Sequence, residues 1–373
     1  MKLVACAPNF SEGRDHRVIQ AITQAIAGVD RVRLLHVDSS RDANRTVVTF
    51  VGEPEAAGEA ILRAVARASL FIDMARHEGL HPRMGALDVC PFIPLPGMSM
   101  DECVQLARQV GERIGKEAKI PVFYYGAAAS AENRRRLAEI RRGEYEGLEE
   151  RMSGPEWQPD AGPTEFNAQL GATAVGAREW LIAYNVNLKA KGAAVAQAIA
   201  LAIRETGPVQ RDSQGRLLKD SEGQPLRRAG TLRACRARGW YLPRFGLAQV
   251  TMNLENWKVT PPHAAYEEVR RQAAMRDVKV IGSELVGMVP LAPMLAAGRH
   301  FLSQSGRTEE ALEEELIGSA GRVMGLSAVK EFDPFNQVLE YRLSREGGEW
   351  ARFVTGMGTR RWTKSAIYEI TKD

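Results

Sequence analysis

Residues 76–94, with the sequence RHEGLHPRMGALDVCPFIP, combine two histidines with glycines and prolines that constrain the backbone. A polar loop beside an apolar, strand-like run is a common place for functional side chains. An imidazole, with an ordinary pKa of about 6.5, can take up and return a proton near neutral pH. His81, held by the proline after it, is therefore a candidate general acid and base, with His77 in support. The alternative is a purely structural hydrogen bond at His81.

The same loop contains HEGLH at 77–81, which matches the zinc-peptidase motif H-E-x-x-H. That motif binds zinc only on a helix, where both imidazoles lie on one face. Gly79 disfavours a helix by about 1 kcal/mol relative to alanine, and Pro82 moves His81 away from helical angles. The longer form of the motif needs glycine at 84 and histidine at 87, where Met84 and Leu87 stand. The sequence therefore favours a role without metal.

Size and composition describe a globular protein. A chain of 373 residues is too long for one ordinary hydrophobic core, so two domains are expected. Hydrophobic residues make up 45% and charged residues 26%, which disfavours long disorder. The net charge of +4 is small and dispersed. No nucleic-acid partner is expected, and a small anionic ligand suits this charge better.

The sequence predicts a cytoplasmic protein that does not enter a membrane. The N-terminus lacks the apolar core of a signal peptide. The longest uncharged run, residues 285–298, has 14 residues with two prolines, too few to span a bilayer. The four cysteines lack C-x-x-C spacing and lie mainly in apolar surroundings, which predicts buried, reduced thiols: Cys6, Cys90, Cys103 and Cys235.

Two similar sets of elements are expected to position the loop. In the first half, strands are predicted at residues 2–7, 32–38, 46–52, 86–93 and 120–125. Helices are predicted after Asp15, from Pro54 and after Ser99. Ser99 forms a capping box with Glu102, which accounts for a glutamate that could otherwise be a distant third zinc ligand.

The second half repeats the order strand, helix, strand, strand, helix, strand. Its strands are predicted at residues 180–188, 232–241, 247–253 and 278–284, and its helices at 193–204 and from 260–262 onward. This order is typical of a ferredoxin-like fold. We therefore predict an α/β (α+β) protein of two ferredoxin-like subdomains, each a mixed or antiparallel sheet with helices on one face.

The predicted subdomains cover residues 1–178 and 179–326, and residues 327–373 form a C-terminal extension of unknown role. Residues 206–230 are rich in glycine, serine, glutamine and charge, which predicts an exposed insertion in the second subdomain.

Four segments closely resemble the formiminotransferase family: APNFSEGR at 7–14, ANRTVVTFVG at 43–52, HPRMGALDVCPFIP at 81–94 and GATAVGAREWLIAYNVNL at 171–188. The resemblance covers residues 1–205 and 239–326, and the linker at 206–238 looks longer than the family requires. Nothing in the chain resembles the cyclodeaminase domain that is fused to this domain in animals. The residues after 326 are too few to hold that domain.

The resemblance implies transfer of a formimino group from N-formimino-L-glutamate to N5 of tetrahydrofolate, which serves as acceptor, in histidine breakdown. It implies two ferredoxin-like subdomains, a homodimer and no metal. The catalytic histidine of the family corresponds to His81. The folate-binding stretch of the family corresponds to Gly162, Pro163, Thr164, Glu165, Phe166, Asn167, Ala168, Gln169, Leu170 and Gly171.

This reaction suggests roles for further polar residues. The formimino group is a cation, so a carboxylate should orient it; Asp38 is the first candidate, with Glu12 and Asp88 as others. Arginine grips carboxylates at two points, and the donor and the folate tail both carry carboxylates. The remaining substrate-binding candidates are Arg45, Arg83, Asn9 and Asn44. For each, a cap, a turn or a solvated surface position is the alternative.

Three other functions remain open on the sequence. A related enzyme would transfer a formimino or formyl group from another donor, such as formiminoglycine. A zinc metallopeptidase would use His77 and His81. A folate-binding protein without turnover would bind folate and form no product.

Overall fold

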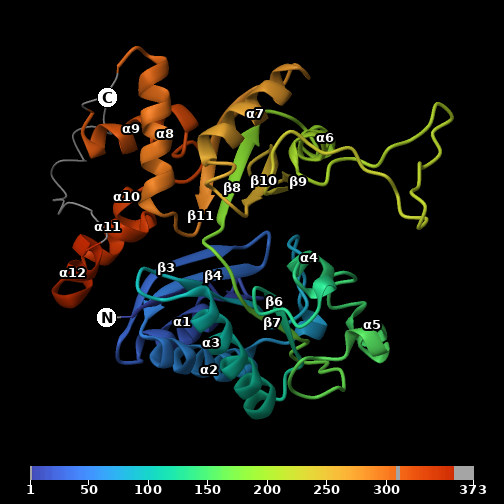
Figure 1. The fold of residues 1–373 in the computed structure, drawn as a ribbon, viewed down its shortest axis with the longest axis vertical. Helices are drawn as coiled ribbons and strands as arrows, with labels where there is room; N and C mark the ends of the chain where they lie inside the picture. The colour runs from blue at the N-terminus through green and yellow to red at the C-terminus, as the bar shows by residue number, and fades with distance from the viewer. Residues whose placement is uncertain (1, 308–310, 357–373) are drawn as a thin grey trace. The chain divides into compact units, whose positions relative to one another are not determined.

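The computed structural model describes residues 2–307 and 311–356 (Figure 1). Its contacts divide the chain between Glu179 and Trp180 into two compact units. Each unit contains one main β-sheet with helices packed against it, so the mixed α/β class predicted from the sequence is confirmed.

Unit 1 is built on a seven-stranded sheet within the described residues. Its strands are β1 Val4–Cys6, β2 Asn9–Phe10, β3 Val32–Ser40, β4 Arg45–Gly52, β5 Leu87–Pro94, β6 Val122–Gly126 and β7 Thr173–Ala177. The order is β1-β4-β2-β5-β7-β6, with β3 paired to β4. Strand β7, which the sequence analysis did not anticipate, pairs in parallel with β5 and β6. All five of its residues are buried, so it lacks the polar alternation that identifies a strand.

Three helices cover one face of this sheet: α1 His16–Ala27, α2 Pro54–Phe71 and α3 Met100–Arg113 (Figure 1). The predicted helix starts are confirmed. The side chain of Asp15 accepts a hydrogen bond from the Arg17 amide, and Ser99 and Glu102 form a complete capping box. Short helices that were not predicted pack against the opposite face through Ile140, Leu148 and Met152: α4 Leu137–Ile140 and α5 Leu148–Ser153.

Unit 2 contains β8 Ile182–Leu188, α6 Ala194–Ile203, β9 Cys235–Leu242, β10 Leu247–Leu254, α7 Pro262–Ala274 and β11 Val280–Val286. The strands form an antiparallel sheet in the order β11-β8-β10-β9. The predicted order of elements in this half is therefore confirmed.

Helices that were not predicted follow this sheet: α8 Leu291–Gln304, α9 Glu313–Met324, α10 Pro334–Gln337, α11 Leu339–Ser344 and α12 Gly348–Gly356. The uncharged run 285–298 largely belongs to α8, whose buried face includes Leu291, Met294 and Ala297. Residues 357–373, the end of the predicted C-terminal extension, lie outside the described residues.

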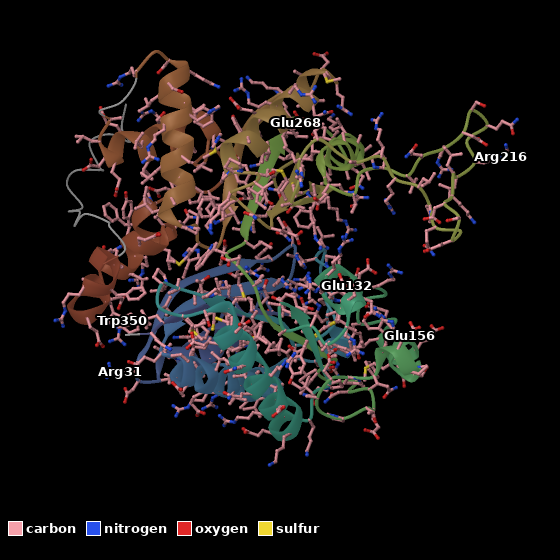
Figure 2. The ribbon with its side chains drawn as sticks, in the orientation of Figure 1. Arg31, Glu132, Glu156, Arg216, Glu268 and Trp350 are labelled. Carbon is pink, nitrogen blue, oxygen red and sulfur yellow. The ribbon has the colours of Figure 1, made fainter. Side chains whose placement is uncertain are left out.

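Residues 206–230 form an arm that projects from unit 2, with Arg216 far out along it (Figure 2). It contains two similar turns. The Asp212 carboxylate accepts hydrogen bonds from the amides of Gln214 and Arg216, both at 2.9 Å. The Asp220 carboxylate accepts two hydrogen bonds in the same way, from the amides of Glu222 and Gln224. The isolated β-bridges of this segment join arm residues only to one another.

Replacing residues 209–227 with a short Gly-Ser linker is therefore expected to change the Tm by less than about 2 °C, because no packed surface is lost. The entropic cost of closing the loop also depends only weakly on the number of residues in it. Thermal unfolding followed by circular dichroism measures this. A drop of more than about 5 °C would show that the arm supports the rest of unit 2.

All four cysteines are buried and free, as the sequence predicted. Among residues 2–307 and 311–356, no helix is long and apolar enough to cross a membrane.

Candidate active site

The histidine loop lies at one edge of the unit 1 sheet. Strand β2 is antiparallel to both β4 and β5, so β4 and β5 begin at the same edge. The loops that enter these strands meet there. The Leu80 amide donates to the Asp42 carbonyl at 3.0 Å, and the Asn44 side-chain amide donates to the Glu78 carbonyl at 2.9 Å. A Cβ on Gly79 would lie 2.2 Å from the Ala43 carbonyl oxygen, so this close approach requires glycine.

The HEGLH segment is not helical, as predicted. A short 3-10 helix, Met74–Arg76, ends before it, and His77 has extended backbone angles of φ −79° and ψ 127°. Both ring nitrogens of His77 are engaged: Arg83 Nε donates to Nδ1 at 3.2 Å, and Nε2 lies 2.8 Å from the Asn44 carbonyl oxygen. Since arginine can only donate, Nε2 carries the ring proton. His77 therefore has no lone pair for zinc, and in the described parts of the chain no three acidic, histidine or cysteine side chains are grouped to hold a metal.

His81 is differently placed. Its Nδ1 lies 2.7 Å from the Pro82 carbonyl oxygen, which can only accept, so Nδ1 carries the proton of the neutral ring. Nε2 then has a free lone pair and makes no hydrogen bond to the described part of the chain. Burial of the ring, with repulsion from Arg45 and Arg141, lowers the pKa of His81 well below its ordinary value, although Asp88 acts in the opposite direction. The result is a neutral imidazole with Nε2 unprotonated.

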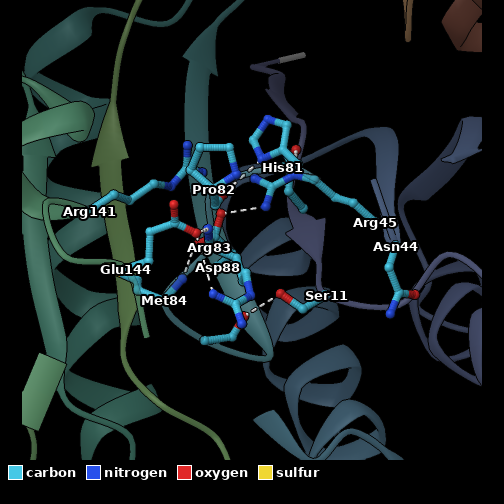
Figure 3. Close-up of polar contacts among 12 residues, drawn as sticks. Ser11, Asn44, Arg45, His81, Pro82, Arg83, Met84, Asp88, Arg141 and Glu144 are labelled. Carbon is cyan, nitrogen blue, oxygen red and sulfur yellow. Dashed lines mark hydrogen bonds and ion pairs between the residues drawn. The ribbon is translucent and has the colours of Figure 1, made fainter. Parts of the chain in front are cut away.

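A buried ion-pair cluster lies beside this ring (Figure 3). Asp88 is the extra residue of a β-bulge, where Asn9 pairs with Val89 and Phe10 with Leu87. Its side chain is 0% exposed and contacts Arg45 at 2.5 Å and also Arg141. Burial alone would raise the pKa of Asp88, but Arg141 and Arg45 outweigh it and lower the pKa to about 2. Asp88 is therefore ionised and fixes both guanidinium groups.

Two other residues that were predicted to bind substrate form hydrogen bonds with the histidine loop and its neighbouring segments. The N–H groups of Arg83 donate to His77, Glu144 and Glu146, so this arginine holds His77 in place. The Asn44 side chain joins the Gly13 amide to the Glu78 carbonyl. These contacts account for both residues without a ligand.

The Asn9 side-chain oxygen accepts a hydrogen bond from Arg45 Nε at 2.9 Å. Glu12 closes a turn by accepting from the amides of Arg14 and Asp15. Asp38 pairs with Val47 and Ser40 with Arg45 across β3 and β4, so Asp38 and Arg45 lie on the same face of the sheet, opposite to α1, α2 and α3.

The predicted ligand segment, residues 162–171, reaches the same edge of the sheet. The Ala86 amide donates to the Leu170 carbonyl at 2.9 Å, which ties the segment to the end of the histidine loop. The side-chain amides of Asn167 and Gln169 donate to the backbone carbonyls of Lys119 and Ser69. Gly162 and Pro163 line a cavity of about 480 Å³, and Thr164, Glu165, Ala168 and Gln169 are exposed.

Three residues of the site were not predicted from the sequence: Arg141, Glu144 and Glu146. They belong to the charged run RRGEYEGLEE at 141–150, which by composition is typical of a solvated surface. Only the fold shows that Arg141 reaches buried Asp88 and that both glutamates face Arg83. No spacing in the sequence connects these partners.

The chain matches two family models. One, described as the N-terminal subdomain of the formiminotransferase domain, covers residues 3–178, and one described as the formiminotransferase domain covers residues 183–344. The second match continues beyond residue 326, where the resemblance seen in the sequence ended.

Curated relatives agree with these matches. A protein named glutamate formimidoyltransferase from Thermoplasma acidophilum is 38% identical and aligns with 87% of this chain and 100% of its own length. A protein of the same name from Streptococcus pyogenes is 36% identical over 85% of this chain and 99% of its own. The formimidoyltransferase-cyclodeaminase of Rattus norvegicus is 44% identical over 93% of this chain, which spans 61% of that relative. The chain therefore covers about three fifths of the larger relatives.

Proposed function

The chain belongs to the formiminotransferase domain family, and from this premise we propose that it is a glutamate formimidoyltransferase. In the proposed reaction the formimino group of N-formimino-L-glutamate moves to N5 of tetrahydrofolate, and L-glutamate is released. N5 adds to the formimino carbon to give a tetrahedral intermediate, and the bond from that carbon to the glutamate nitrogen then breaks. N5 loses one proton, and the departing nitrogen gains one.

The observation that carries this proposal is the state of His81. Its neutral ring has a free lone pair on Nε2, while Nδ1 is held by the Pro82 carbonyl. We assign Nε2 as the base that takes the proton from N5 and then returns it to the glutamate nitrogen. Catalysis of this kind contributes about 10²–10⁴-fold. Holding the two substrates together supplies much of the remaining acceleration.

We propose that residues 162–171 bind the folate. The position of this segment supports the assignment, because it borders the histidine loop through the hydrogen bond from the Ala86 amide to the Leu170 carbonyl. Phe166 and Tyr145, with ring centroids 5.4 Å apart, supply an aromatic surface suited to a flat ring system. Since the amides of Asn167 and Gln169 already hydrogen-bond the protein backbone, contact should come mainly from the backbone and the exposed side chains.

We keep Asp38 as the first candidate to orient the cationic formimino group. It shares a sheet face with Arg45, whereas Glu12 is used in a turn and Asp88 in the buried cluster.

We also assign both units to the ferredoxin-like fold. In unit 2 the spatial strand order β11-β8-β10-β9 supports this assignment, as do the helices that follow β8 and β10, the first and third strands of this unit along the chain. We further propose a homodimer that acts in the cytoplasm without a metal. The buried free thiols suit a reducing compartment.

The test is turnover of N-formimino-L-glutamate with tetrahydrofolate in the presence of a metal chelator, read as 5,10-methenyltetrahydrofolate after acid treatment. We expect chelator-resistant activity. Loss of activity with the chelator would overturn the metal-free mechanism, and faster turnover of formiminoglycine would overturn the donor. Folate binding without product from either donor would identify a binding protein instead.

A further inference from the structure

We propose that Arg45 and Arg141, held in place by Asp88, form the receptor for a carboxylate of the donor substrate. This inference rests on the proposed function, because it assigns the part of the site that recognises a glutamate-type donor. Arg141, which directly follows α4, is the new residue of the site. It takes the place that the sequence analysis gave to Arg83, whose donors are used to hold His77.

The first support is an excess of buried positive charge. The side chains of Arg45, Arg141 and Asp88 are 6%, 13% and 0% exposed, and they carry two positive charges and one negative charge. Glu144 and Glu146 do not restore the balance, because they contact Arg83 and are 40% and 64% exposed, where water screens them. A buried cation without its own counter-ion is costly unless an anion joins it.

The second support is the set of donors left over. Asp88 is fully used: Oδ2 contacts both arginines, and Oδ1 accepts from the Met84 amide at 2.9 Å. Arg141 contacts it through Nη2, and Arg141 Nε is buried without a hydrogen-bond partner in the described chain. A buried guanidinium donor of this kind requires an explanation, and a planar carboxylate is its natural partner.

The third support is the position beside the proposed base. Arg45 and Arg141 approach Asp88 from opposite sides, with His81 next to them (Figure 3). Both arginines repel a proton on His81. A carboxylate bound between them would weaken that repulsion and raise the pKa of His81, so donor binding would make Nε2 a stronger base.

The test compares Arg141→Met and Arg141→Lys with Arg142→Met. Arg142 is the neighbouring arginine, its side chain is 73% exposed, and among the described residues it forms an ion pair with surface Glu139, so it is a matched control. Arg141→Met should raise the KM for N-formimino-L-glutamate by about 10- to 100-fold, the loss expected for a charge-assisted contact. The KM for tetrahydrofolate should stay within about twofold, and Arg142→Met should match the wild type.

Arg141→Lys keeps a positive charge beside Asp88 and so protects the fold, but it loses the planar two-point contact. It should raise the donor KM by about fivefold or more. Direct binding of L-glutamate, L-glutamine and L-isoglutamine, measured by calorimetry, identifies the carboxylate concerned. L-glutamine and L-isoglutamine each lack one of the two carboxylates of L-glutamate. The ligand without the carboxylate that the arginines bind should have a lower affinity for the wild type, and Arg141→Met should not change that affinity.

The proposed function and the carboxylate receptor are tested by different outcomes. If the wild type turns over no formimino donor, the proposed function is overturned. If the wild type is active while both folded Arg141 variants keep the wild-type KM for the donor and the wild-type affinity for L-glutamate, the receptor alone is overturned, and the cluster is only structural.

Discussion

His81→Ala should lower kcat for formimino transfer by about 10²–10⁴-fold, because it removes the group that moves the proton between the two nitrogens. The KM values for both substrates should change little, since the arginines and the segment 162–171 remain. Steady-state kinetics at saturating tetrahydrofolate measures this. The change removes one side-chain hydrogen bond, from Nδ1 to the Pro82 carbonyl, so the variant should fold.

A suitable control is His16→Ala. His16 is exposed on the first turn of α1, and alanine is a strong helix former. This variant should retain wild-type kcat. Full activity of His81→Ala would show that the ring only binds the Pro82 carbonyl, and the assignment of Nε2 as the base would be wrong.

The pH profile of kcat/KM tests the state of the same ring. The reaction needs the unprotonated form of His81, so activity should fall as the pH drops through the pKa of His81 in the free enzyme. Burial and the two arginines lower that pKa. The acid limb should therefore lie below about pH 6.5, the ordinary value for histidine. An acid limb centred above pH 7 would contradict the lowered pKa.

Asp88→Ala should destabilise the protein by about 3–5 kcal/mol, because it leaves two buried guanidinium groups without their counter-ion. Unfolding in denaturant, followed by circular dichroism, measures the loss. Asp30→Ala, at an exposed turn position, should stay within about 0.5 kcal/mol of the wild type. A loss below about 1 kcal/mol for Asp88→Ala would show that water reaches the arginines.

The same variant has a predictable pH dependence. The pKa of Asp88 is lowered to about 2 in the folded protein, against about 3.9 in an unfolded chain. The carboxylate therefore stabilises the fold above about pH 4, and this contribution disappears as the pH falls towards 2. The difference in stability between the wild type and Asp88→Ala should narrow over that range.

The sequence was sufficient to predict those structural features that depend on residues close together in the chain. Asp15, and Ser99 with Glu102, mark helix starts that the structure confirms, because a cap satisfies backbone amides within three residues of itself. Gly79 and Pro82 correctly indicated that HEGLH is not helical, since backbone preferences act on neighbouring residues. The buried strand β7 was missed because burial on both faces removes the alternating pattern of a strand. Helix α8 has a buried face at helical spacing, so its periodic signal was present in the sequence and was not used.

The sequence by itself therefore determined that the loop holding His81 is not helical, and the order of most elements, because both depend on neighbouring residues. The tertiary structure decided which charges meet. It brings Arg141 to Asp88 across 53 positions of the chain, turns Arg83 towards His77 and Glu146, and leaves the free nitrogen of His81 beside two arginines. Ion pairs form between groups that folding brings together in space, and their partners lie too far apart in the chain for spacing to reveal them.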